Sequence, residues 1–135
     1  MDNRPIGVFD SGLGGLTVVK EIMSCLPGEN IVYFGDTARI PYGTRSSETV
    51  IKYSIQCIKF LISQGIKMVV IACNTASSTS LEVVQKMFDI PIIGVIEPGA
   101  QGAVKATKNG KVGVIGTEGT IRSGAYVRAI HSRNP

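Results

Sequence analysis

The sequence VVIACNTASS, residues 69–78, leads from a short apolar run directly into a polar stretch that can start a helix. The run is rich in β-branched residues, which favours a buried strand. Asn74 or Thr75 is a suitable N-cap for the following helix, because amide and hydroxyl oxygens accept the free N–H groups of a first turn. The stretch therefore predicts a strand and a helix joined at one cysteine, Cys73.

The same arrangement recurs along the chain. Five apolar runs of strand length are each preceded by a polar or turn residue and followed by polar or glycine-rich sequence. They are PIGVF (5–9), NIVYF (30–34), MVVIA (68–72), PIIGV (91–95) and KVGVI (111–115). Segments with helical spacing lie between them. Strands that alternate with helices predict an α/β fold, in which helices flank a parallel sheet and the crossovers are right-handed.

Two of the helical segments show the apolar face of an amphipathic helix. The face within residues 47–64 comprises Val50, Cys57, Ile58 and Leu61, and the earlier face comprises Leu16, Val19, Ile22, Met23 and Leu26. Free thiols in proteins are mostly buried. We therefore expect Cys57 and Cys25, which both lie on these helices, to pack in the core.

The chain ends after a helical stretch, residues 118–130, without a closing strand. The sheet would then lack an edge element, so we expect a fragment of a longer polypeptide. The 135 residues match one ordinary domain, and 44% of them are hydrophobic. No apolar run approaches the roughly 20 residues of a membrane span, and the N-terminus lacks a secretory signal, so we expect a cytoplasmic protein.

The net charge of +4 is local to the end of the chain. Residues 1–103 carry eight basic and nine acidic side chains, whereas residues 104–135 carry six basic and one acidic. A nucleic-acid-binding track would interleave such basic residues with aromatic ones, and this segment does not. We therefore expect a solvated basic face, and neither nucleic acid nor a membrane as a partner.

The chain has few of the cysteine and histidine residues that metal sites and serine hydrolases need. Its three cysteines lie far apart in the sequence, and His131 is the only histidine. Zinc sites need closely spaced ligands, and serine hydrolases need an imidazole base. The sequence therefore argues against a metal centre, a disulfide framework and serine–histidine hydrolysis.

Each apolar run is followed by a distinct polar cluster. The clusters are DSGLGG (10–15), GDTARIPYGT (35–44), CNTASS (73–78), EPG (97–99) and GTEGT (116–120). In open α/β sheets, ligands bind outside the carboxyl ends of the strands. We therefore expect the five clusters to face one crevice.

The first cluster follows a strand and opens a helix, as a nucleotide-binding loop does, but its spacing fails. A glycine is required three residues after Gly14, and Thr17 stands there. Asp10 would also repel a pyrophosphate, and Phe9 stands where a nucleophile elbow needs glycine. None of the five clusters offers a lysine for a pyridoxal phosphate Schiff base.

Cys73 is the strongest candidate for chemistry. A helix N-terminus carries roughly half a positive charge, which favours the thiolate form of a cysteine placed there. A nucleophilic role would need a histidine, and His131 lies far along the chain, so removal of a carbon-bound proton is the favoured role. Such a base needs donors for the substrate's carboxylate, and Ser11, Asn74 and Thr75 are suitable. A buried structural cysteine is the alternative.

Asp10 directly follows the first predicted strand. A carboxylate at the end of a buried strand usually caps the next helix or binds an ammonium group. Both hypotheses stay open on the sequence alone.

Three motifs occur in order and in register: GVFDSGLGGLTV, YFGDTARIPYGTRS and ACNTAS. Together they make the chain resemble the first half of the bacterial glutamate racemases, in the aspartate/glutamate racemase family. PIIGVIEPGA and VGVIGTEGT extend the resemblance over all 135 residues. The resemblance implies a two-lobed fold with the active site between the lobes. Residues 1–97 would form a first α/β lobe without its last elements, and residues 98–135 the start of the second.

The resemblance also implies roles for individual residues. Cys73 would be one of two catalytic thiols, and Asp10 would assist its proton transfers. The residues implied to bind the substrate are Asp10, Ser11, Tyr42, Gly43, Asn74 and Thr75, with Thr117 as a further contributor. Tyr42 and Gly43 would close over the substrate. No cofactor is implied, and the small-molecule partner is glutamate.

Inversion of a stereocentre by proton exchange needs an acid on one face of the α-carbon and a base on the other. The family's second thiol would lie beyond residue 135, since Cys25 and Cys57 are on helix faces. We therefore expect the chain alone to be inactive, as one half of an enzyme that supplies D-glutamate for peptidoglycan, with a homodimer as the candidate assembly. The alternatives are an aspartate racemase, a one-thiol decarboxylase of the same fold, or a non-catalytic module that binds an acidic amino acid or a partner chain.

Overall fold

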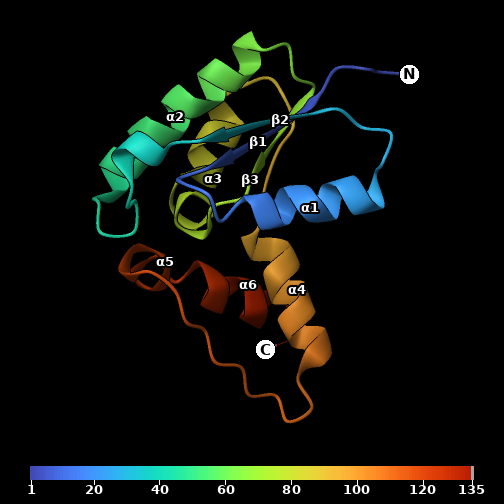
Figure 1. Cartoon of the computed structure of the whole chain (residues 1–135). Helices are drawn as coiled ribbons and strands as arrows, with labels where there is room; N and C mark the ends of the chain where they lie inside the picture. Colours follow the sequence, from blue (N-terminus) through green and yellow to red (C-terminus); the bar gives the residue numbers. More distant parts are fainter. Residues whose placement is uncertain (135) are drawn as a thin grey trace.

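The computed structural model describes residues 1–134 of the chain (Figure 1). The strands are β1 (Ile6–Asp10), β2 (Ile31–Gly35), β3 (Met68–Ile71) and β4 (Ile92–Gly94). The helices are α1 (Leu16–Cys25), the short 3₁₀ turn η1 (Thr37–Arg39), α2 (Ser47–Ser63), α3 (Asn74–Met87), α4 (Ile96–Ala106), α5 (Glu118–Ser123) and α6 (Ala125–Arg133). Within the described residues, none of the helices is both long and apolar enough to span a bilayer.

The four strands form one parallel sheet in the order β2-β1-β3-β4. β1 is central, and its Phe9 is aligned with Phe34 of β2 and with Ile71 of β3. All five residues of β1 are buried, as expected for a parallel strand that is covered on both faces. The α/β fold with helices flanking a parallel sheet is therefore confirmed, as are four of the five predicted strands.

Alternate residues of the sheet belong to two separate hydrophobic clusters, because successive side chains of a strand point to opposite faces. Phe9 and Ile71 lie in the cluster under α2 and α3, together with the fully buried Leu61. Val8 and Val70 lie in the other cluster, under α1. Figure 1 shows the resulting layers, with α2 and α3 on one side of the sheet and α1 on the other.

Helix α2 shows how the local sequence fixes this packing. Ser46 caps the helix by accepting the N–H of Thr49 at 3.2 Å. The predicted apolar face of α2 is buried in full. On the same face, Ser54 lies with its Oγ 3.0 Å from the Oγ of Ser80 in α3. Both serines are fully buried, and their small size lets α2 and α3 pack closely.

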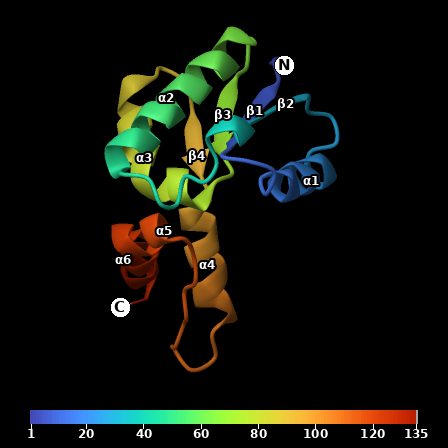
Figure 2. The same ribbon diagram turned by 60° about the vertical axis from the view of Figure 1, so that its left-hand side comes forward.

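Helices α4, α5 and α6 form a separate layer next to the start of α3 (Figure 2). Its hydrophobic cluster is small and is built on Ile96, Ala100 and Ala129. An ion pair of 2.5 Å between Glu97 and Arg133 also joins α4 to α6. Most of the buried apolar side chains therefore belong to the sheet and its flanking helices.

Three expected elements differ in the structure. KVGVI (111–115) pairs with no strand among the described residues, and without a neighbour its backbone groups cannot form a ladder. The expected helix 118–130 is divided into α5 and α6, because Gly124 between them has a left-handed backbone with φ of 65°. EPG (97–99) lies in the first turn of α4 rather than in a loop.

Cys57 is buried as predicted, but the prediction for Cys25 is wrong, because this thiol is exposed. Helix α1 covers its face of the sheet only through partly buried residues such as Val19 and Ile22. The other residues of its predicted apolar face, Leu16, Met23 and Leu26, are exposed. A single helix lying on the sheet buries a narrower stripe than its sequence pattern suggests.

Candidate active site

A crevice of about 490 Å³ opens at the carboxyl ends of β1 and β3. Its main walls are the glycine-rich loop 10–14 and the β3–α3 junction 72–75. Ile40, Val95, Thr117 and Tyr126 complete the lining near these walls, together with Thr17 and Val18 of α1. Two of the five predicted polar clusters, 10–15 and 73–78, therefore form the crevice, and the others contribute single residues or none.

Cys73 is the N-cap of α3, a position that the sequence assigned to Asn74 or Thr75. Its backbone is still extended, and its Sγ accepts the N–H of Ala76 at 3.4 Å. Asn74 and Thr75 are already inside the helix, so the sulfur takes the capping place. A sulfur at this point lies at the positive end of the helix dipole, where negative charge is favoured.

The thiol of Cys73 also contacts the loop after β1. Its Sγ lies 3.5 Å from the hydroxyl of Ser11, which is 62 residues away in the sequence. The Cys73 side chain is only 6% exposed, yet it lines the crevice. Ser11 and Cys73, both predicted site residues, are therefore brought together at one wall of the crevice.

Asp10 ends β1 and is buried. Its Oδ2 accepts the N–H groups of Gly12 at 3.0 Å and of Gly15 at 3.1 Å, so this carboxylate holds the glycine-rich turn. A side chain at Gly15 would not fit, because its Cβ would lie 2.6 Å from the Cβ of Asp10 and 3.0 Å from that of Ala72. Asp10 therefore holds the loop that leads into α1 without accepting an N–H group of the helix itself, and ammonium binding stays a prediction.

Tyr33 of β2 supports the same turn from the neighbouring strand. Its hydroxyl donates to the carbonyl of Gly12 at 2.6 Å. Burial, reinforced by the negative charge of Asp10, raises the pKa of Tyr33 to about 12. The hydroxyl therefore stays protonated at neutral pH and remains a donor to the turn.

Asn74 and Thr75 connect the crevice to the layer of α5 and α6. The hydroxyl oxygens of Thr75 and Thr117 lie 2.7 Å apart. Tyr126 donates its hydroxyl to Oδ1 of Asn74 at 2.5 Å. Thr117 in turn caps α5 by accepting the N–H of Thr120 at 3.4 Å. The first two residues of α3 therefore face the crevice and hold the second layer at the same time.

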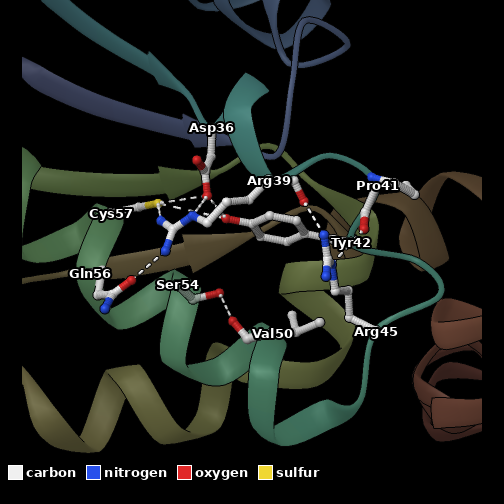
Figure 3. Close-up of polar contacts among 9 residues, drawn as sticks. All are labelled: Asp36, Arg39, Pro41, Tyr42, Arg45, Val50, Ser54, Gln56 and Cys57. Atoms are coloured by element: carbon white, nitrogen blue, oxygen red, sulfur yellow. Dashed lines mark hydrogen bonds and ion pairs between the residues drawn. The ribbon is translucent and has the colours of Figure 1, made fainter.

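Tyr42 and Gly43 are not among the residues that line the crevice. The Tyr42 ring is 1% exposed in the main core, and its hydroxyl donates to Asp36 (Figure 3). The carbonyl of Gly43 accepts the N–H of Gly119 at 2.9 Å, and a Cβ on Gly43 would overlap with Thr117. Closure of these two residues over a substrate stays a prediction, and in this conformation the Tyr42 hydroxyl faces the core.

Asp36 anchors the loop that carries Tyr42, as Figure 3 shows. Its Oδ2 accepts the Nε–H of Arg39 at 2.6 Å and lies 3.8 Å from the Sγ of Cys57. Burial raises the pKa of Cys57 to about 11, and burial also raises the pKa of Tyr42. Cys57 and Tyr42 therefore stay neutral donors to one buried carboxylate, a role in holding the loop.

Sequence reasoning misses Tyr33, which supports the crevice wall through Gly12, and Tyr126, which lines the crevice, because the partner of each is far away in the chain. The distance in sequence is 21 residues from Tyr33 to Gly12 and 52 residues from Tyr126 to Asn74. The pairing of β1 with β2 is a signal for Tyr33, since both strands are predicted. No local pattern marks Tyr126.

Comparison with known proteins gives one consistent family. The family model for Asp/Glu/Hydantoin racemase matches residues 6–134. A glutamate racemase from Geobacter metallireducens is 59% identical over 132 residues, which cover 98% of this chain and 49% of that protein. The chain spans about half the length of the curated relatives it matches.

Solved structures of similar proteins agree with this match. The crystal structure of a glutamate racemase isoform from Bacillus anthracis has a TM-score of 0.95 and 49% identity, over 99% of this chain and 50% of that chain. The glutamate racemase from Francisella tularensis, solved in complex with D-glutamate, has a TM-score of 0.91 and 53% identity. That match covers 100% of this chain and 50% of the other.

Proposed function

The chain belongs to the Asp/Glu/hydantoin racemase family, and from this premise we propose that it forms one half of the active site of a glutamate racemase. The reaction interconverts L- and D-glutamate at the α-carbon without a cofactor. The observation that carries the proposal is the position of Cys73. Its Sγ caps α3, lies 3.5 Å from the hydroxyl of Ser11 and lines the crevice at the carboxyl ends of the strands.

Cys73 takes the α-proton of glutamate as a thiolate. The C–H bond breaks, an S–H bond forms, and the electron pair of the C–H bond moves onto the α-carbon and its carboxylate. The N-terminus of α3 favours negative charge on the sulfur before this transfer. An acid on the opposite face then gives a proton to the α-carbon, and the centre is inverted. In the reverse direction, the Cys73 thiol donates the proton.

The other predicted site residues hold the substrate in this scheme. Asp10 keeps the glycine-rich turn in place and offers a carboxylate for the substrate's ammonium group. Ser11 and Asn74 offer donors for the carboxylate on which charge develops. Thr75 contributes the N-terminal end of α3, since its hydroxyl is already engaged with Thr117.

The group on the opposite face comes, in this proposal, from the half of the relatives that the chain does not cover. Residues 1–97 act as the first lobe, and residues 98–134 begin the second. Among the described residues, Cys73 is the one thiol that lines the crevice. Cys25 is exposed on α1, and Cys57 is buried beside Asp36. Neither can therefore serve as the second base.

Exchange of the α-proton in deuterated water tests the proposal. Glutamate is incubated with the 135-residue chain alone and with the chain fused to the complementary half of a full-length relative. We expect racemisation by the fused form only. Cys73→Ala in the fused form should lower the racemisation rate by about 10²–10⁴-fold. Cys25→Ala is the matched control, because it removes an exposed thiol away from the crevice.

Two results would contradict the proposal: full racemisation by the short chain alone, or full activity of the Cys73→Ala fused form. Turnover of aspartate or of arylmalonates in place of glutamate would instead indicate an aspartate racemase or a one-thiol decarboxylase. Ligand binding that is unchanged by Cys73→Ala, without exchange in any longer form, would indicate a non-catalytic module.

The setting of the reaction follows from its product. D-glutamate made by the complete enzyme would supply peptidoglycan synthesis, a cytoplasmic step. We propose a homodimer as the assembly of the complete enzyme. Sedimentation of the fused form measures this directly, and a monomer at all protein concentrations would exclude it.

A further inference from the structure

Tyr126 is a crevice residue to which the proposed reaction gives no role. It comes from α6, and its hydroxyl donates to Oδ1 of Asn74 at 2.5 Å. The ring is seated against α4, where a Cβ on Gly99 would lie only 3.1 Å from Cε1 of Tyr126. Tyr126 and Asn74 both line the crevice that contains Cys73. The contact therefore ties the second layer to the first turn of α3.

The chemistry of this hydrogen bond determines how the Asn74 amide is oriented. A distance of 2.5 Å is within the range of an O–H···O bond and is shorter than an N–H···O bond usually is. Burial raises the pKa of Tyr126, so the phenol stays protonated at neutral pH and can donate. The amide oxygen is thus engaged, and Nδ2 has no hydrogen-bond partner among residues 1–134. Its two N–H groups are available to a ligand.

We propose that Tyr126 is a positioning residue, which holds the Asn74 amide so that Nδ2 donates to a carboxylate of the bound amino acid. The inference rests on the proposed function, because it names the substrate group that Asn74 meets. A rotated amide would present its oxygen to the carboxylate and repel it. Two N–H donors without a competing acceptor favour an anion. Tyr126 therefore contributes to the selection of a carboxylate without touching it.

The neighbouring contact between the two layers cannot orient the Asn74 amide in place of Tyr126. Thr75 and Thr117 are joined through two hydroxyl groups 2.7 Å apart. A hydroxyl rotates and can donate or accept, so this pair holds the layers together without fixing the direction of any donor. The orientation of Asn74 depends on Tyr126 alone among the described residues.

Tyr126→Phe removes only the hydroxyl and can be tested in the 135-residue chain. We expect the side-chain amide of Asn74 to lose order, measured as a fall in its NMR order parameter, while the backbone signals of the core keep their positions. Tyr53→Phe is the matched control, because the Tyr53 ring is half-buried and its hydroxyl forms no hydrogen bond with residues 1–134. An unchanged Asn74 amide in Tyr126→Phe would overturn the proposal. This measurement needs no ligand, so it is independent of the proposed reaction.

A titration of the fused form with glutamate tests the link to the substrate. We expect Tyr126→Phe to raise the Kd about threefold to tenfold, the loss typical of one hydrogen bond. In an Asn74→Ala background the same substitution should have no further effect, since it acts through Asn74. An equal increase in both backgrounds would overturn the proposal. If the fused form does not bind glutamate at all, the proposed function fails, and the order of the Asn74 amide still decides the positioning role.

Discussion

Residues 1–97 and residues 98–134 differ in how much apolar surface they bury. The first segment holds two hydrophobic clusters, one on each face of a four-stranded sheet. The second contributes two buried residues, Ala100 and Ala129, and three partly buried ones to a small cluster, and it leaves Ile115 98% exposed. The position of Cys73 is therefore set by a well-packed unit, whereas the residues that face it are held by a thin layer.

The junction between the two segments depends on few contacts. They include the hydrogen bonds of Gly43 with Gly119, of Thr75 with Thr117 and of Asn74 with Tyr126, and the ion pair of Glu97 with Arg133. The three hydrogen bonds start from residues that the sequence assigns to the substrate site. Substrate binding and the placement of the second segment are therefore coupled in the proposed function.

The largest expected effect is the loss of stability when a buried side chain of the first segment is shortened, compared with an exposed one of the second. Leu61 is fully buried in the cluster under α2. Leu61→Ala should lower the free energy of unfolding by about 2–5 kcal/mol, because buried methyl groups are lost and a cavity remains. Ile115→Ala should change it by less than about 0.5 kcal/mol, because its side chain already meets water. Urea unfolding followed by circular dichroism measures both.

Equal losses of unfolding free energy in Leu61→Ala and Ile115→Ala would contradict the difference in packing between the two segments. They would mean that residues 111–115 are buried in solution, for example as a strand of the kind that their sequence predicts. A concentration-dependent loss for Ile115→Ala would identify a second copy of the chain as the partner.

The contrast between the segments also explains what the sequence can predict. Val8 and Val69 lie in runs whose own composition demands burial, and the helices between them fix the parallel order. KVGVI (111–115) has the same composition, but a strand also needs a neighbour, and nothing in the run says whether one exists. The prediction that Cys25 is buried fails for a related reason. The width of the buried stripe on α1 depends on how much of the sheet face this single helix covers.

The candidate site divides in the same way. Cys73, Asn74 and Thr75 are visible in the sequence, because a strand end followed by a helix start is a local signal. The contact of Cys73 with Ser11 follows once the sheet is predicted, since both lie at carboxyl ends of neighbouring strands. The contact of Tyr126 with Asn74 depends on how two layers dock, and no spacing in the sequence encodes that.

A smaller effect comes from ionisation inside the first segment. Burial raises the pKa of Cys57 from 9.0 to about 11, so the unfolded chain ionises before the folded one does. The stabilisation is complete below about pH 9 and is lost as the pH rises to about 11, which bounds it at about 3 kcal/mol. We expect the free energy of unfolding to fall over this window.

Cys57→Ser is the matched variant for this effect, because serine keeps a donor near Asp36 and does not titrate. The alkaline loss should be smaller in Cys57→Ser and unchanged in Cys25→Ser, whose thiol is exposed. The alkaline loss of stability that remains in Cys57→Ser should extend toward pH 12, where Tyr33 ionises. An identical alkaline loss in Cys57→Ser would show that Cys57 is not its source.

The smallest effect concerns the junction itself. A Cβ on Gly43 would overlap with the Cβ of Thr117, and a Cβ cannot rotate away from its own backbone, so the backbone on one side of the junction must shift. Gly43→Ala should therefore weaken the junction by about 1–2 kcal/mol, within the range of overpacking effects. The N–H of Gly119, which donates to the carbonyl of Gly43, should exchange with solvent about tenfold faster.

Gly102→Ala gives the matched control, because a Cβ there meets no atom within 4 Å and the site lies inside α4. Helix propensity predicts that it stabilises α4 by up to about 1 kcal/mol, without any change at Gly119. Faster exchange of Gly119 in Gly43→Ala, with protection in β1 and β3 unchanged, would show that the junction opens while the sheet stays folded. Exchange that rises equally at Gly119 and in the sheet would mean that the two segments unfold as one unit.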